Sequence, residues 1–159
     1  MKPKIETIPE IKLIGMSCSM SLANNKTPKL WGRFMPRKNE IKNNIGVDLY
    51  AMQIYLSYSF KDFTPETIFE QWASVAVTDF NAVPAGMETY VVPVGLYAVF
   101  IHKGLPSDFP KTMEYIVKTW FPKSKYTWDN RPHFQVMGEK YKNNNPASEE
   151  EVWVAIKLK

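Results

Sequence analysis

The sequence contains very little of what disulfides, metal sites and most nucleophilic active sites are built from. Cys18 is the single cysteine, and His102 and His133 are the only histidines among 159 residues. One cysteine excludes an internal disulfide and a cysteine-based metal cluster, and two histidines without metal-ligand spacing do not indicate a metal site. We therefore expect no metal, and we interpret Cys18 as a packed thiol.

Common cofactor motifs and targeting signals are also missing. The chain has no glycine-rich nucleotide loop and no GxSxG elbow, which removes the obvious nucleotide-binding and acyl-transfer classes. No apolar run approaches the roughly 18 residues that a membrane span needs. The N-terminus, MKPKIETIPEIKL, has the character of neither a signal peptide nor a transit peptide. We expect a cytoplasmic protein with no cofactor and no membrane partner.

Positive charge is present but is spread thinly. The net charge is +4, and its main concentration is the run RKNEIKNN at 37–44. That run lacks the aromatic interleaving of a nucleic-acid site, so we interpret it as a solvated helix face. Residues 1–10, expected to form a loose lead-in, are too few for a helix-turn-helix. Direct binding of nucleic acid is therefore not expected.

Aromatic and thioether side chains are abundant. The chain has 5 Trp, 8 Tyr, 9 Phe and 8 Met, within a composition that is 45% hydrophobic and 23% charged. These values are those of an ordinary globular domain with a surplus of aromatic residues. The surplus fits either a thick core or a pocket lined by aromatic and thioether groups.

The second half of the chain predicts the order strand, helix, strand, strand. Its strand-like segments are 95–104, 131–141 and 150–158. Between the first two, 107–126 has apolar residues at helical spacing. The first half predicts the same order, with strands at 11–20, 47–56 and 69–80, and a helix from Thr27 that kinks or ends at Pro36. A short strand is predicted at 87–93, between the halves. In the strand at 11–20, Gly15 marks a bulge or a close approach of the backbone to a neighbouring segment.

The two halves resemble one another. MPRK at 35–38 follows the first helix as FPKS at 121–124 follows the second, and EQWASVAV at 70–77 matches EEVWVAIK at 150–157, with offsets of 86 and 81 residues. We predict an α+β fold of two βαββ units (about 11–79 and 88–159) in one domain, 11–159, with an antiparallel sheet, two main helices on one side and a pseudo-twofold axis.

Strand parity suggests a pocket between these units. Val152 and every second residue after it in the strand form an aliphatic face. Trp153 therefore points to the opposite face, as Trp72 does in the first half. In 131–141, Gln135 and Met137 share the less apolar face. We predict that these faces line a central cleft with the two indoles on opposite walls; an exposed sheet with an incidental tryptophan is the alternative.

The candidate ligand-binding residues are aromatic, thioether, amide or acidic side chains: Trp31, Tyr50, Met52, Glu70, Trp72, Phe100, Gln135, Met137 and Trp153. For each of them the alternative is core packing. No residue is assigned a catalytic role.

Four segments carry a family resemblance: GLYAVFIHKG, the helix ending WFPKSKY, RPHFQVMGEKY and EEEVWVAIK, extended into the first half by LWGRFMPRKNEI and FEQWASVAV. Together they resemble the gyrase-inhibitor-like (GyrI-like) effector-binding family, found on AraC-type and MerR-type transcription activators and also alone, including in integron cassettes. The resemblance implies two βαββ units and multidrug binding of hydrophobic, often cationic, small molecules between them. At the position of Gln135 the family motif usually has a glutamate that faces the cation.

We therefore expect a sensor or sequestering protein for a hydrophobic aromatic, in some cases cationic, small molecule rather than an enzyme. Because glutamine carries no charge, Glu70 or Glu139 would have to supply a carboxylate for a cation. Two alternatives stay open: a hydrolase of reactive cyclopropane-type genotoxins, and an inhibitor of gyrase or another partner protein. In the sensor interpretation, ligand loading acts on a separate regulator.

Overall fold

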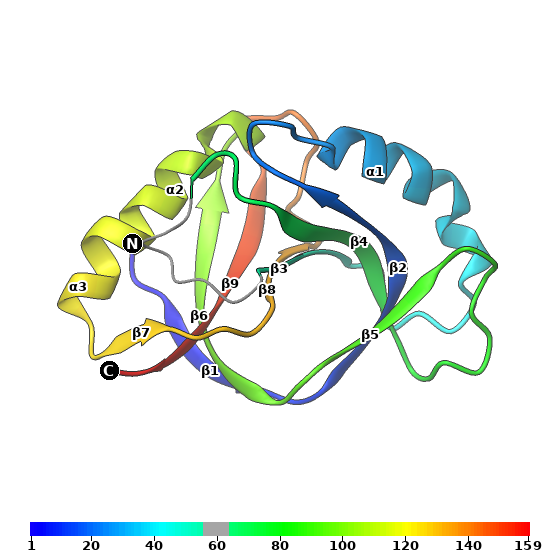
Figure 1. The fold of residues 1–159 in the computed structure, drawn as a ribbon, viewed down its shortest axis with the longest axis horizontal. Helices are drawn as coiled ribbons and strands as arrows, with labels where there is room; N and C mark the ends of the chain where they lie inside the picture. Colours follow the sequence, from blue (N-terminus) through cyan, green and yellow to red (C-terminus); the bar gives the residue numbers. More distant parts are fainter. Residues whose placement is uncertain (56–63) are drawn as a thin grey trace.

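The computed structural model describes residues 1–55 and 64–159 (Figure 1). Within these residues the strands are β1 (Lys4–Ile8), β2 (Ile11–Met20), β3 (Leu49–Ile54), β4 (Phe69–Val77), β5 (Glu88–Val92), β6 (Gly95–Lys103), β7 (Tyr126–Trp128), β8 (His133–Met137) and β9 (Glu149–Leu158). The end of the strand predicted at 47–56 and the residues that follow it, up to 63, lie outside the described residues.

Prolines set where the helical segments begin and end. The segments are α1 (Thr27–Phe34), a 3-10 turn (Met35–Glu40), a short 3-10 turn (Pro106–Asp108), α2 (Phe109–Tyr115), a π-helical turn (Ile116–Trp120) and α3 (Phe121–Lys123). Pro28 lies in the first turn of α1, where its missing N–H costs nothing, whereas Pro36 converts the continuation into the 3-10 turn. The predicted early end at Pro36 is confirmed.

The described strands form an antiparallel sheet in the order β1-β6-β9-β8-β3-β4-β2-β5, with β7 alongside β9. The two halves of the chain meet at β3 and β8 in its middle. There Met52 lies opposite Phe134, and each has the tryptophan strand of its own half as its other neighbour. The α+β class is confirmed, with β2-α1-β3-β4 and β6-α2-β8-β9 as the repeated unit.

Both faces of the sheet are buried in apolar cores. On the face that we call the helix face, α1 packs on Ile14, Met16, Ala73, Val75 and Val77, and α2 packs on Ala98, Phe100, Val152, Val154 and Ile156. The opposite, inner face holds a third core: Ile8, Leu13, Met52, Trp72, Ala76, Val92, Tyr97, Phe134, Val136 and Ala155. Burying a large apolar side chain contributes roughly 1.5–3 kcal/mol, so each core is a major source of stability.

Gly15 allows β2 and β4 to come close together. A Cβ at this position would overlap the carbonyl oxygen of Ala73 and lie 2.7 Å from Cα of Ser74. The predicted close approach at Gly15 is therefore confirmed, because only a residue without a side chain fits there.

The outermost strands are exchanged between the halves. β1 leads directly into β2 but pairs with β6 of the second half, and β5 leads into β6 but pairs with β2 of the first half. Residues 1–10 were expected to be a loose lead-in. Instead β1 occupies half of that segment, because its backbone completes the edge beside β6.

Candidate ligand-binding site

The two predicted pocket tryptophans lie on the same face of one continuous sheet. Across four neighbouring strands the inner face carries Trp72, Met52, Phe134 and Trp153 in one row. Three strand spacings separate the indoles by about 14 Å. Met52 and Phe134, which are 0% and 2% exposed, occupy the row between them, and Phe134 stacks on Trp153 with centroids 5.5 Å apart. The predicted arrangement of two indoles across an open cleft is wrong.

A glutamate accepts the indole N–H of each tryptophan from the same face of its own strand. Trp72 Nε1 donates to Glu70 Oε1 at 2.5 Å, and Trp153 Nε1 donates to Glu151 Oε1 at 3.4 Å. The repeated Glu-x-Trp spacing is a structural counterpart of the duplication seen in the sequence. Glu70 is therefore engaged on the inner face rather than facing the helices.

Tyr50 is the other predicted site residue on the inner face. Burial raises the pKa of the Tyr50 hydroxyl, with the charges of Asp48 and Glu151 acting in the same direction. Tyr50 also lines an open hollow of about 310 Å³ at the start of β2 and the end of β4, together with Glu10, Ile11, Lys12, Ile45, Ala76, Val77 and Thr78.

Gln135 and Met137 lie on the helix face, away from the tryptophans. Gln135 is in register with Val152, a member of the core under α2, whereas Phe134 is in register with Trp153. The prediction that Gln135 shares a face with Trp153 is wrong. Its cause is that both faces are apolar, so the more aliphatic parity of a strand does not identify the helix-covered side.

Phe100 and Trp31 take part in the cores under the helices. Phe100 is 1% exposed and packs edge-on against Trp120, with centroids 5.2 Å apart. Trp31, on α1, packs edge-on against Phe34 at 5.9 Å. Core packing, the alternative considered for both, is what the structure shows.

Three glutamines form a hydrogen-bonded group on the helix face, which we call the amide strip: Gln53, Gln71 and Gln135. Gln53 Nε2 donates to Gln135 Oε1 at 2.9 Å and to Gln71 Oε1 at 3.2 Å, and Gln135 Nε2 donates back to Gln53 Oε1 at 3.1 Å. Gln53 and Gln71 are buried and Gln135 is partly exposed. Because an amide has two N–H donors, Gln135 keeps one that no described residue accepts.

Aromatic rings adjoin the amide strip at one end. Tyr55 lies 5.1 Å from Phe69, 5.9 Å from His133 and 6.2 Å from Trp128, measured between ring centroids. His133 stacks on Trp128 at 3.8 Å. The group presents aromatic faces next to hydrogen-bonding amides, which is the composition of small-molecule sites.

His133 is held in its neutral form. The backbone N–H of Ala155 donates to Nδ1 of His133 at 2.9 Å, so the proton of the ring lies on Nε2. Burial, with a further contribution from the charge of Arg131, lowers the pKa of His133 to about 3. His133 therefore adds an uncharged ring to the site at neutral pH.

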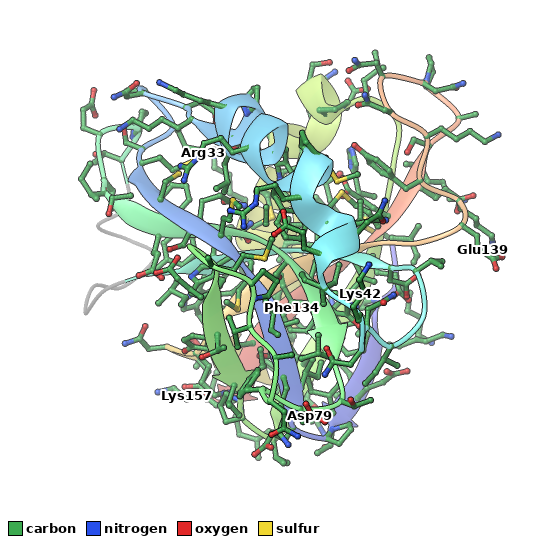
Figure 2. All side chains as sticks on the ribbon, turned by 90° about the vertical axis from the view of Figure 1, so that its right-hand side faces the viewer. Arg33, Lys42, Asp79, Phe134, Glu139 and Lys157 are labelled. Atoms are coloured by element: carbon green, nitrogen blue, oxygen red, sulfur yellow. The ribbon has the colours of Figure 1, made fainter. Side chains whose placement is uncertain are left out.

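Carboxylates lie at the other end of β8 and β9. Glu150 is on the helix face opposite His102 and is partly buried, whereas Glu139 is exposed and projects from the margin of the molecule (Figure 2). Burial raises the pKa of Glu150, and the nearby His102 opposes that rise. Glu150, at the start of the strand predicted at 150–158, was not among the predicted site residues.

Sequence periodicity missed the residues that surround Gln135: Gln53, Tyr55, Gln71, Trp128, His133 and Glu150. One signal for Gln53 was available, because Gln53 and Gln135 are 82 residues apart and the two tryptophans are 81 apart. Trp128 reaches His133 only because β7 folds back beside β9, which no local pattern indicates.

Comparison with known proteins agrees with this architecture. The model of the GyrI-like small molecule binding domain matches residues 1–157. The transcriptional regulator BrlR of Pseudomonas aeruginosa is 29% identical over 116 residues, which are 73% of this chain and 40% of BrlR. The chain thus spans well under half the length of that relative.

Two solved structures share the fold. SAV2435 bound to tetraphenylphosphonium superposes with a TM-score of 0.73 at 16% identity, over 99% of this chain and 94% of that one. The integron cassette protein VCH_CASS2 of Vibrio cholerae superposes with a TM-score of 0.69 at 16% identity, over 98% and 96%. These two likenesses show that the fold is shared. This chain belongs to the GyrI-like small molecule binding domain family.

None of the helices in the described part of the chain has the length and apolarity needed to cross a bilayer.

Proposed function

We propose that this domain binds a hydrophobic aromatic small molecule on the helix face, over the amide strip and against the rings of Tyr55 and Trp128. α1 packs on β2 and β4 and α2 packs on β6 and β9, while β3 and β8 between them carry Gln53 and Gln135 of the strip (Figure 1). A flat ligand would stack on the rings while its polar atoms meet the amides.

The partly exposed Gln135 carries this proposal. It is oriented by two hydrogen bonds to Gln53 and still offers one N–H. A buried polar group is costly unless it is bonded, so a site of this kind favours a ligand with an acceptor atom. Family membership and the tetraphenylphosphonium bound to SAV2435 support a ligand of this size and hydrophobicity.

The role that we propose is sensing or sequestration, with a partner that responds to ligand occupancy. BrlR is a transcriptional regulator, which supports a regulatory setting for the domain. Hydrolysis of a bound electrophile remains the competing function, and product analysis after incubation with such a compound separates it from simple binding.

Titration with tetraphenylphosphonium and with neutral triphenylphosphine oxide, followed by calorimetry and tryptophan fluorescence, tests the proposal. We expect saturable binding of both probes and a fluorescence change that is reduced in Trp128→Phe. Binding of the oxide, whose oxygen atom can accept the free N–H of Gln135, should weaken in Gln135→Ala. Trp72→Phe, on the inner face, is the matched control and should bind as the unmodified protein does. Binding that is lost in the control but kept in Gln135→Ala would move the site to the inner face.

A further inference from the structure

Three consecutive glutamates begin β9 and differ in what they contact. Glu149 lies 3.9 Å from Lys103 Nζ, and Glu151 accepts the indole N–H of Trp153. Glu150 points to the opposite face from both, and its carboxylate forms no hydrogen bond or ion pair with any described residue. Although the run is acidic throughout, all three side chains are partly buried in the strand.

Glu150 is a neighbour of the amide strip. Val152 is directly opposite Gln135, and Glu150 is the next residue along β9 on the same face. Such diagonal neighbours lie roughly 7–8 Å apart in an antiparallel pair, which is within reach of one drug-sized ligand. The carboxylate and the amides therefore adjoin the same surface.

The groups around Glu150 make no direct bond to its carboxylate. His102, opposite it on β6, uses both ring nitrogens: Nδ1 contacts Thr112 Oγ1 at 2.7 Å, and Nε2 donates to the carbonyl of Leu105 at 3.1 Å. The carbonyl can only accept, so Nε2 carries a proton, whereas the hydroxyl of Thr112 can donate to or accept from Nδ1. Tyr141 is the other titratable group close by, and it too is partly buried.

A partly buried carboxylate without a partner is unfavourable, and a weakly hydrated cation relieves that cost better than a well-hydrated one does. We propose that Glu150, rather than residue 135, supplies the negative charge with which this domain recognises lipophilic organic cations. The inference rests on the ligand site proposed above and adds the class of ligand. Gln135 then orients the ligand while Glu150 selects for positive charge.

Two probes of similar shape isolate the charge: tetraphenylphosphonium, a cation, and triphenylphosphine oxide, which is neutral. Calorimetric titration of Glu150→Gln should show roughly tenfold weaker binding of the cation and less than about twofold change for the oxide. Glu151→Gln, with its carboxylate on the inner face, is the matched control and should leave both affinities unchanged.

The outcomes separate this inference from the proposed function. If neither probe binds the unmodified protein, the proposed ligand site fails. If both bind and Glu150→Gln keeps its affinity for the cation, or Glu151→Gln loses it, only the role of Glu150 is overturned. Should Glu150→Gln not fold, the unmodified protein provides the test. Binding of the cation must weaken on acidification, because Glu150 becomes protonated, whereas binding of the oxide must not. If acidification affects the two probes equally, the role of Glu150 is rejected.

Discussion

Gln53 and Gln135 exchange two hydrogen bonds across the junction of the two halves, at 2.9 and 3.1 Å. They occupy corresponding places on β3 and β8, on either side of the Met52–Phe134 pair. Each amide therefore acts as donor and acceptor for its counterpart, and the pair is uncharged. This exchange fixes both side chains in the middle of the helix face.

Replacing Gln135 by glutamate should destabilise the protein even though the shape is kept. The bond donated by Gln53 remains, but the returning N–H is lost and two oxygens face each other. We expect the free energy of unfolding in urea to fall by about 1–2 kcal/mol at pH 7. The loss should shrink near pH 4, where the new carboxyl group is protonated. Glu139→Gln, at an exposed position, serves as the control for a change of charge alone.

Gly15→Ala should be strongly destabilising, because the added methyl group would overlap backbone atoms of Ala73 and Ser74. Forcing β2 and β4 apart should cost about 2–3 kcal/mol, measured by urea unfolding. Gly32, in α1, is the matched control, because no atom lies within 4 Å of the place that an added methyl group would take. Gly32→Ala should stabilise the protein by roughly 0.5–1 kcal/mol, since alanine is the better helix former. Equal effects at the two glycines would contradict the close approach of the strands.

His133 should make the protein less stable in mild acid. Its pKa is lowered to about 3 in the folded state, whereas an unfolded histidine titrates near 6.5, so the unfolded chain binds more protons between these values. Stability should therefore fall as the pH drops from about 6.5 toward 3, by up to roughly 1.4 kcal/mol per pH unit for this group. His133→Gln should remove that component of the slope. An identical pH dependence in the two proteins would show that the pKa of His133 is the same in the folded and the unfolded chain.

The two Glu-x-Trp contacts should differ in strength. Trp72 donates to Glu70 at 2.5 Å and Trp153 donates to Glu151 at 3.4 Å. Glu70→Ala should lower the free energy of unfolding by about 1–2 kcal/mol, and Glu151→Ala by less than about 1 kcal/mol. Thermal and urea unfolding of both variants give the comparison. If Glu151→Ala lowers the free energy of unfolding more than Glu70→Ala does, the longer hydrogen bond is the stronger one and the expected ranking is wrong.

Strand parity predicted the elements well but did not predict which face each one presents. The strand at 11–20 and the helix end at Pro36 follow from local patterns and are confirmed. The face of Gln135 depends on its register with Val152, a contact between distant segments. Because the sheet has an apolar core on each side, the alternation of side chains along a strand is equally compatible with either face lying under the helices.

The surroundings of the amide strip were the least predictable part. Tyr55, Trp128 and His133 come from three separate segments, and they meet only because β3 pairs with β8 and both β7 and β8 pair with β9. Glu150 had the appearance of a solvated charge because its neighbours in sequence are also acidic. Only the strand geometry distinguishes its side of the sheet from theirs.

The exchange of β1 and β5 ties the halves together crosswise. A chain cut between β4 and β5 would leave each fragment holding the outer strand that the other fragment lacks, so each alone would present an unpaired edge. Such fragments should regain the native sheet when mixed. The same connectivity gives two intact copies a route to trade these strands, so the linkers at 9–10 and 93–94 are hinges at which a swapped dimer would form.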